Sequence, residues 1–172
     1  MGATRQLPQE AVEALEDRFA SAGDNRWVAG VAARDGWLAA NRAYLAAMRR
    51  RGAEEMAMLM EAAGATRPVA LPEAVRLLET ALPLWASGTR VKPLARKNET
   101  VVLEIRVANC PIYAQLHKTG WQGVTACGNW HRRQGWYEAL GLIAEDSLLK
   151  EKKWGYGACV IRVKLRSAPC PA

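Results

Sequence analysis

Two alternating apolar runs decide the fold, TVVLEIRVANCP at residues 100–111 and ACVIRVKLR at residues 158–166. In each run apolar residues, many of them β-branched, alternate with charged ones, which predicts a strand with one buried and one solvated face. The stretch from Thr100 to Arg166 also holds both histidines, three of the four cysteines and four of the seven tryptophans. We therefore expect the chemistry of the chain to lie in this stretch.

Glycine and proline positions, together with apolar spacing, divide the rest of the chain. Within the stretch, the expected elements are a strand at 100–108, helices at 112–118 and 121–140, a strand at 141–147, a charged connection at 148–156 and a last strand at 158–166. Before Thr100, apolar residues recur at helical spacing. Helices are expected there at 8–22, 26–51, 53–63 and 72–86, with Gly52 separating the second from the third, followed by a basic linker at 89–98.

The predicted fold class is α+β. A helical N-terminal region, 1–98, precedes a region, 99–172, that forms a small antiparallel sheet with helices packed on one face. The chain of 172 residues is long enough to bury a real core. We expect the two regions to form one compact unit.

Composition favours a cytoplasmic protein. No apolar run approaches the ~20 residues needed to cross a bilayer, and the first residues lack the apolar stretch of a secretion signal. Four cysteines do not make a dense disulfide framework, so in a reducing cytosol they are expected to be thiols. No membrane partner is expected, and a homo-oligomer stays open.

The formal net charge of +7 raises the question of an anionic partner. The basic residues are scattered along the chain, at the end of a helix (49–51), in the linker (90–97) and at alternate positions of the last strand (162–166). No recognition-helix pattern or aromatic platform accompanies them. We therefore interpret them as solvated faces and expect no nucleic-acid partner.

Cys127 and His131 are four residues apart, a spacing that puts two side chains on one face of a helix. A histidine at that distance can take a thiol proton, which is what a nucleophilic cysteine needs. Arg132 and Arg133, which follow, can hold a substrate carboxylate. The alternative is that Cys127 is a small buried residue and His131 a surface residue.

Two further cysteines join these candidates. Cys110 ends the first strand before Pro111, where a thiol is close to the backbone N–H groups of a helix start. Cys159 is in phase with the apolar residues of the last strand, so it is expected to face the core. If Cys110, Cys127, Cys159 and His131 converge, they suit zinc or another thiophilic metal, although no C-x2-C pair is present. Whether a metal or any cofactor is bound stays open.

Aromatic residues surround the cysteines. Trp130 and Tyr113 are candidates for the wall of a small-molecule pocket, and the same aromatic residues can equally form the core between sheet and helices. The chain has no GxGxxG, no P-loop lysine motif and no HExxH helix. Nucleotide binding and metalloprotease chemistry therefore have no support.

Several short motifs resemble the L-2-amino-thiazoline-4-carboxylic acid hydrolase family. They are Asn109-Cys110-Pro111-Ile112-Tyr113, then Cys127 after a short helix, then Ser147-Leu148-Leu149-Lys150, and finally Gly157-Ala158-Cys159 opening the last strand. The resemblance implies hydrolytic opening of a small ring at a carbon–nitrogen bond other than a peptide bond. It singles out the three cysteines. In the family an acidic residue often follows the second cysteine, where this chain has Gly128-Asn129-Trp130-His131.

A glycine and a cysteine before a final strand also resemble the 4-vinyl reductase domain group. That likeness implies a small-molecule-binding or sensor module, with or without a metal. Three hypotheses follow. The first is a hydrolase with Cys127 as nucleophile or ligand, His131 as base and Cys110 as second sulfur. The second is a binding module that uses the same pocket without turnover. The third is a helical interaction protein.

Overall fold

The computed structural model describes residues 9–20, 26–65, 69–97, 99–120 and 127–168. Six helices and one short 3-10 helix lie within these ranges. They are α1 (Gln9–Ala20), α2 (Arg26–Asp35), α3 (Trp37–Ala63), α4 (Leu71–Trp85), α5 (Pro111–Thr119), α6 (Gly128–Ala139) and the 3-10 helix η3 (Lys152–Trp154).

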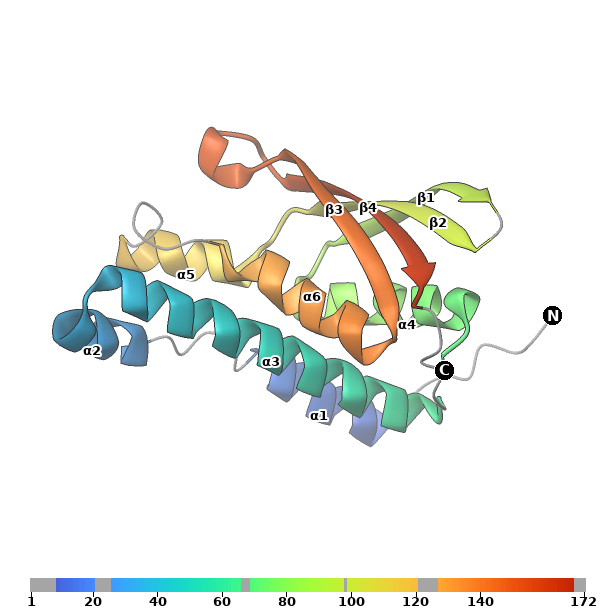
Figure 1. Ribbon diagram of the computed structural model, residues 1–172, viewed down its shortest axis with the longest axis horizontal. Helices are drawn as coiled ribbons and strands as arrows, with labels where there is room; N and C mark the ends of the chain where they lie inside the picture. The colour runs from blue at the N-terminus through green and yellow to red at the C-terminus, as the bar shows by residue number, and fades with distance from the viewer. Residues whose placement is uncertain (1–8, 21–25, 66–68, 98, 121–126, 169–172) are drawn as a thin grey trace.

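Four strands form one antiparallel sheet in the order β1-β2-β4-β3. Their bounds are β1 (Arg90–Lys97), β2 (Thr100–Val107), β3 (Leu142–Lys150) and β4 (Cys159–Ser167). Both alternating runs are therefore strands, and they pair with each other at the centre of the sheet. The six α-helices lie on one side of the sheet (Figure 1). Helix α3 runs along α6, and α1 and α2 lie against the far side of α3. The predicted α+β class is confirmed.

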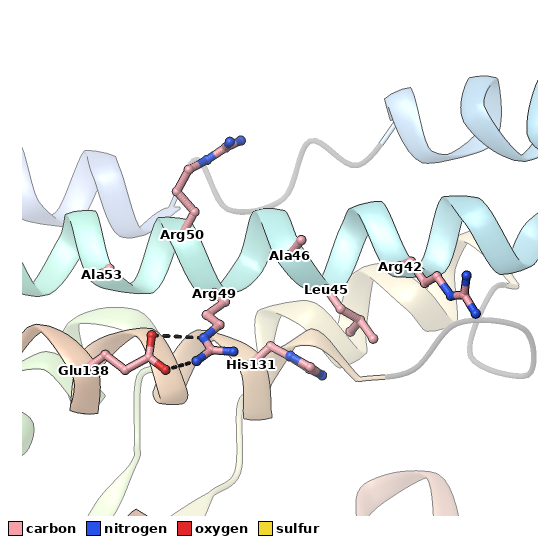
Figure 2. A pocket seen from close by; sticks show the side chains of 8 residues that line it. All are labelled: Arg42, Leu45, Ala46, Arg49, Arg50, Ala53, His131 and Glu138. Carbon is pink, nitrogen blue, oxygen red and sulfur yellow. Dashed lines mark hydrogen bonds and ion pairs between the residues drawn. The ribbon is translucent and has the colours of Figure 1, made fainter. Parts of the chain in front are cut away.

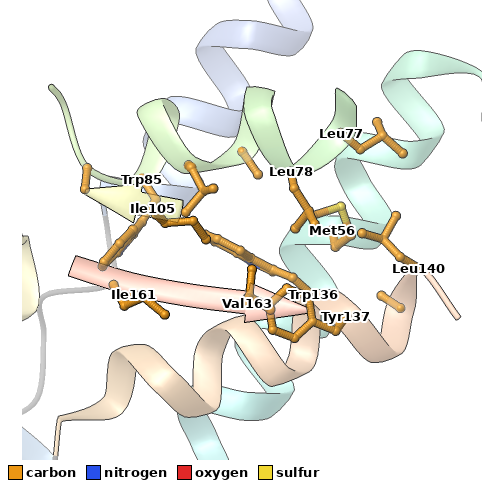
Figure 3. Packing of buried hydrophobic residues seen from close by; sticks show 14 of the residues in the cluster. Met56, Leu77, Leu78, Trp85, Ile105, Trp136, Tyr137, Leu140, Ile161 and Val163 are labelled. Atoms are coloured by element: carbon orange, nitrogen blue, oxygen red, sulfur yellow. The ribbon is translucent and has the colours of Figure 1, made fainter. Parts of the chain in front are cut away.

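The core lies between the inner face of the sheet and helices α3, α4 and α6. Ile105 of β2 and Val163 of β4 pack there with Trp85, Trp136 and Met56 from the helices (Figure 3). Burying such side chains stabilises the fold by roughly 2 kcal/mol for each large residue. Cys159 is buried in phase with these strand residues, as predicted.

Two predicted breaks in the helical region are placed differently. The predicted helix 26–51 is interrupted at Gly36, whose φ of 83° is a conformation that glycine adopts without strain. By contrast α3 runs through Gly52, so the separation predicted there is wrong. A Cβ on Gly52 would lie 2.0 Å from the backbone oxygen of Arg132. Gly52 is a contact point between α3 and α6 and does not end a helix.

The basic linker predicted at 89–98 is also wrong, because residues 90–97 form strand β1 and pair with β2. The run of N-terminal helices, α1 to α4, therefore ends at Trp85. Of the helix predicted at 121–140, residues 121–126 lie outside the described part, and α6 begins at Gly128. The strand predicted at 141–147 is confirmed and continues to Lys150. No described helix is long and apolar enough to cross a membrane.

Candidate functional site

A cavity of about 220 Å³ lies between the start of α6, the last residues of β3 and the first residues of β4. Its walls carry thiol, carboxylate, amide and guanidinium groups as well as apolar side chains. The lining residues are Cys127, Asn129, Trp130, Arg133, Asp146, Leu148, Glu151, Cys159 and Ile161. A smaller hollow of about 20 Å³ shares Cys127, Glu151 and Cys159 with the cavity and adds Cys110 and Tyr113. The three described thiols thus border one region, which we call the thiol pocket.

Two of these cysteines stand at helix starts. Cys110 is the N-cap of α5, and its Sγ accepts a hydrogen bond from the backbone N–H of Tyr113 at 3.4 Å. Cys127 is the N-cap of α6. The third, Cys159, begins β4, and its Sγ accepts from the backbone N–H of Lys152 at 3.4 Å. Backbone geometry at element ends therefore brings the sulfur atoms together.

Burial keeps two of the thiols, Cys110 and Cys127, protonated. It raises the pKa of Cys110 to about 12, with the charge of Cys127 adding to the effect. It also raises the pKa of Cys127, against the backbone N–H of Asn129 and the charge of Arg133, both of which lower it. Since the thiolate is the nucleophile, Cys110 and Cys127 are held in their unreactive form at neutral pH.

Arg133 and Asp146 form one wall of the pocket. The Arg133 Nη2 donates to Asp146 Oδ2 at 2.6 Å, and its Nε donates to the same oxygen at 3.1 Å. The Tyr137 hydroxyl donates to Asp146 Oδ1 at 3.2 Å. Burial by itself lowers the pKa of Arg133, but Tyr137 and Asp146 outweigh it and hold that pKa above its ordinary value. Arg133 is therefore charged and largely neutralised by Asp146.

Asn129 and Glu151 supply hydrogen-bond acceptors at the pocket. Asn129 is only 4% exposed, and its Oδ1 has no hydrogen-bond partner among the described residues. A buried polar atom without a partner costs about 1–3 kcal/mol. Glu151 is also buried, and its carboxylate lies 3.3 Å from Lys153 Nζ. The pocket thus presents acceptors that a bound donor can satisfy.

Tyr113 is held by a lysine at the edge of the smaller hollow. Lys152 Nζ lies 5.4 Å from the centre of the Tyr113 ring and donates to the carbonyl oxygen of Ala108 at 2.8 Å. Trp130 lines the main cavity and is 47% exposed. The predicted placement of both aromatic side chains beside the cysteines is therefore found.

His131 does not line the thiol pocket. It lies in a shallow groove of about 530 Å³ between α3 and α6, together with Leu45, Arg49 and Glu138 (Figure 2). The reason is that Cys127 precedes the first helical residue, so the four-residue spacing does not put it in phase with His131. Burial and the nearby Arg49 charge lower the pKa of His131. The structure does not bring the predicted Cys127–His131 pair together.

Arg132 lies in the core rather than in the pocket. Its side chain is 0% exposed, and its Nε donates to Glu55 Oε2 at 2.7 Å. The guanidinium lies 5.4 Å from the Trp85 ring and 5.8 Å from the Trp136 ring. Its predicted contact with a substrate carboxylate is therefore not available in this conformation.

The structure does not form the four-residue metal cluster proposed from the sequence, because His131 is elsewhere. Among the described residues, no three His, Cys, Asp or Glu side chains are grouped so that they could hold a metal ion. The three cysteines remain neighbours in the pocket, without the geometry of a metal centre.

Sequence reasoning missed Asn129, Asp146 and Glu151. For Asp146 a signal exists, since it occupies the inward phase of β3, opposite the buried Val163 of β4. A carboxylate at an inward strand position needs a partner, and a nearby arginine is the natural one. Neither Asn129 nor Glu151 gives such a signal.

The fold and pocket define a small α+β protein with a thiol-lined cavity. Comparison of the chain with protein-family models, with curated proteins and with solved structures finds no match.

Proposed function

We propose that the protein binds a small molecule in the thiol pocket. The observation that carries this proposal is Asn129, a lining residue of the cavity whose buried Oδ1 has no partner among the described residues. An unpartnered acceptor is unfavourable in the empty protein and becomes favourable when a ligand donates to it. Ligand binding therefore gives this asparagine a role that packing alone does not.

The lining indicates the chemistry of the ligand. Leu148, Ile161 and Trp130 offer apolar surface, while Asn129 and Glu151 offer acceptors. Arg133 is already paired with Asp146. That wall of the pocket therefore offers no unpaired cation to bind a ligand carboxylate. A cavity of about 220 Å³ is smaller than the usual site for a drug-sized molecule. The best complement is a compact apolar molecule that carries an ammonium, amidine or amide N–H.

A thermal-shift series tests this ligand class. Benzylamine and benzamidine, which carry an N–H donor on an apolar ring, are expected to raise the melting temperature. Toluene and benzoate, matched in size, are expected to raise it less or not at all. Equal stabilisation by benzoate and benzylamine would contradict the proposed chemistry.

Asn129→Leu separates a ligand-binding role from a structural one. Replacing an unpartnered buried amide with an apolar group of similar size is expected to keep or raise the stability of the unliganded protein. The same change should abolish the shift caused by benzylamine. Asn109→Ala, at an exposed asparagine, is the matched control and should leave the shift unchanged. Loss of stability in Asn129→Leu, with the melting-temperature shift by benzylamine retained, would contradict the proposal.

A second candidate is hydrolysis of a carbon–nitrogen bond in a small ring, as the family resemblance implies. The observation that favours it is the position of Cys127 at the N-terminal end of α6, where Asn129 N–H and Arg133 both act to lower its pKa and Glu151 lies close by. In this proposal Glu151 takes the thiol proton and the sulfur bonds to the ring carbon. The ring nitrogen takes that proton as its bond to carbon breaks. The oxygen of water then bonds to that carbon, the carbon–sulfur bond breaks, and a proton from the water returns to the Cys127 sulfur as the product leaves.

Turnover of L-2-amino-thiazoline-4-carboxylate by the purified protein tests the hydrolase proposal. Cys127→Ala should abolish product formation and leave benzylamine binding in place. Cys159→Ala, at another thiol of the same pocket, is the comparison variant. Ligand stabilisation without any product from the wild-type protein would leave binding as the function and remove hydrolysis.

A further inference from the structure

The outer face of the sheet gathers the basic residues that look scattered in the sequence. None of the described helices covers this face (Figure 1). On the two central strands, the strand register puts four basic side chains on it, all of them exposed. They are Arg106 of β2 and Arg162, Lys164 and Arg166 of β4.

The edge strands add four more basic side chains to the same face. They are Arg90, Lys92 and Lys97 of β1 and Lys150 of β3. Only two acidic residues lie among the eight basic ones, Glu104 and Glu145. They lie 3.9 Å from Arg162 and 3.6 Å from Lys164. The face carries a net six positive charges, against +7 for the full sequence.

This charge is not explained by protection of sheet edges. Lysines on edge strands commonly prevent edge-to-edge aggregation. The residues on β2 and β4 are central, however, and gain nothing from that function. Arg90 also lies directly opposite Arg106, a like-charge pair that destabilises a sheet. An anionic surface against the face would offset that repulsion.

We propose that this face docks on a bilayer that contains anionic lipid. A plane of lipid headgroups matches a broad basic face, and each Lys or Arg near such a surface adds to binding. The paired positions of the face include no aromatic residue, so it lacks the stacking platform that single-stranded nucleic acids need. The strand register and the charge therefore favour a lipid headgroup surface over a single-stranded nucleic acid.

The connection between β3 and β4 supplies the apolar contacts that favour lipid over duplex nucleic acid. Trp154 is 57% exposed and Tyr156 is 46% exposed, and Leu149 near the end of β3 is 42% exposed. Lys150 Nζ lies 5.5 Å from the centre of the Tyr156 ring, which joins this connection to the basic face. Tryptophan and tyrosine beside lysine are typical of a membrane–water interface. The phosphate backbone of a duplex would leave these side chains without a role.

Vesicle co-sedimentation tests the proposal with the full chain. Binding is expected to vesicles of phosphatidylcholine that contain phosphatidylserine, to be weak with phosphatidylcholine alone, and to fall as salt rises above about 150 mM. The triple variant Lys97→Glu, Arg106→Glu, Arg166→Glu should bind at least tenfold more weakly. Equal binding to both kinds of vesicle, or an unchanged triple variant, overturns the proposal.

The matched control is Arg42→Glu, Arg50→Glu, Arg76→Glu, three exposed helical residues with the same change in net charge. It should retain at least half of the vesicle binding. An equal loss in this control would mean that net charge alone, and not the sheet face, is responsible. Melting temperatures of both variants check that each is folded.

Removal of the aromatic side chains separates lipid from nucleic acid. Trp154→Ser with Tyr156→Ser is expected to weaken vesicle binding severalfold and to leave any binding to a short DNA duplex unchanged. Tighter binding of the wild-type protein to the duplex than to anionic vesicles at the same salt concentration would assign the face to nucleic acid and overturn the membrane proposal.

Discussion

Arg132 and Arg133 are consecutive residues of α6, and each forms a buried ion pair in a different environment. Arg132 pairs with Glu55 of α3 and lies between Trp85 and Trp136, on the side of α6 that faces the helices. Arg133 pairs with Asp146 of β3 on the side that faces the sheet. The first pair is enclosed by packed groups, whereas the second borders a cavity.

Under the proposed function, the difference separates a buried charge that serves packing from one that borders the ligand site. On the helix side α3 and α6 approach so closely that glycines are required at their contact. On the sheet side the chain leaves a cavity lined by two thiols and by Asn129, whose buried amide oxygen has no partner among the described residues. Two neighbouring residues of identical type therefore have different surroundings, which the elements packed against them define.

The strongest test of the helix side is Glu55→Gln. Removing the carboxylate leaves the buried Arg132 guanidinium without its compensating charge, and breaking such a pair is expected to cost about 4 kcal/mol. Urea unfolding followed by tryptophan fluorescence measures this. Glu138→Gln is the control, because the Arg49–Glu138 pair joins the same two helices at the exposed surface and contributes at most about 1 kcal/mol. Equal effects of the two changes would remove the distinction between buried and exposed pairs.

Gly135→Ala tests how tightly α3 and α6 are packed. A Cβ at this position would lie 2.0 Å from the backbone oxygen of Arg49, and backbone cannot rotate aside as a side chain does. Separation of the helices is expected to cost about 3 kcal/mol of unfolding free energy. Gly30→Ala is the control, since a Cβ there meets nothing within 4 Å and the change is expected to stabilise α2 by about 0.5–1 kcal/mol. If Gly135→Ala unfolds at the urea concentration of the wild type, the close approach of the helices is absent in solution.

The strands that could be predicted from the sequence are those with one buried and one solvated face. The strands β2 and β4 show this alternation along their whole length. The edge strand β1 is exposed at nearly every position and contains Pro93, so it has no period-two pattern and resembles a linker. Its existence depends on the hydrogen-bonding edge of β2, which local sequence does not show.

Whether a glycine in the helical half ends a helix is also decided by contacts that local sequence does not show. At Gly36 a positive φ interrupts the helix. At Gly52 the backbone stays helical, and the missing side chain allows α6 to approach α3. Both are single glycines in alanine-rich surroundings. The difference is a tertiary contact, and it is invisible to a reading of helical periodicity.

For the site, the sequence left open whether the three cysteines converge, and in the structure they border one pocket. Sequence reasoning missed the partners that surround them. Cys110 at a helix start follows from the proline after it. The Cys127–His131 pair assumed a helix that already includes Cys127, whereas α6 begins one residue later. Because Cys127 lies before the first helical residue, helical spacing does not fix the direction of its side chain, and Cys127 and His131 line different sides of α6.

Alkylation of Cys110 and Cys127 tests the side of α6 that faces the sheet. Burial raises the pKa of Cys127 and Cys110, so alkylation by iodoacetamide at neutral pH is expected to be at least about tenfold slower than for free cysteine. Because only the thiolate reacts, the rate should keep rising about tenfold for each pH unit beyond the pH at which free cysteine levels off. Mass spectrometry of each modified peptide measures the rates. Rapid modification of Cys127 at neutral pH would indicate an activated nucleophile and favour the hydrolase proposal.

His131→Ala is expected to have the smallest effect. The histidine lines the groove on the α3 side, away from the thiol pocket, so its loss should leave the alkylation rate of Cys127 and the benzylamine shift unchanged. A general base of Cys127 would instead account for about a hundredfold or more of the rate. The same alkylation and thermal-shift measurements distinguish the two cases. A large decrease in His131→Ala would mean that α6 starts earlier in solution and brings Cys127 into phase with His131, so that chemistry would lie on the side of α6 that now looks purely structural.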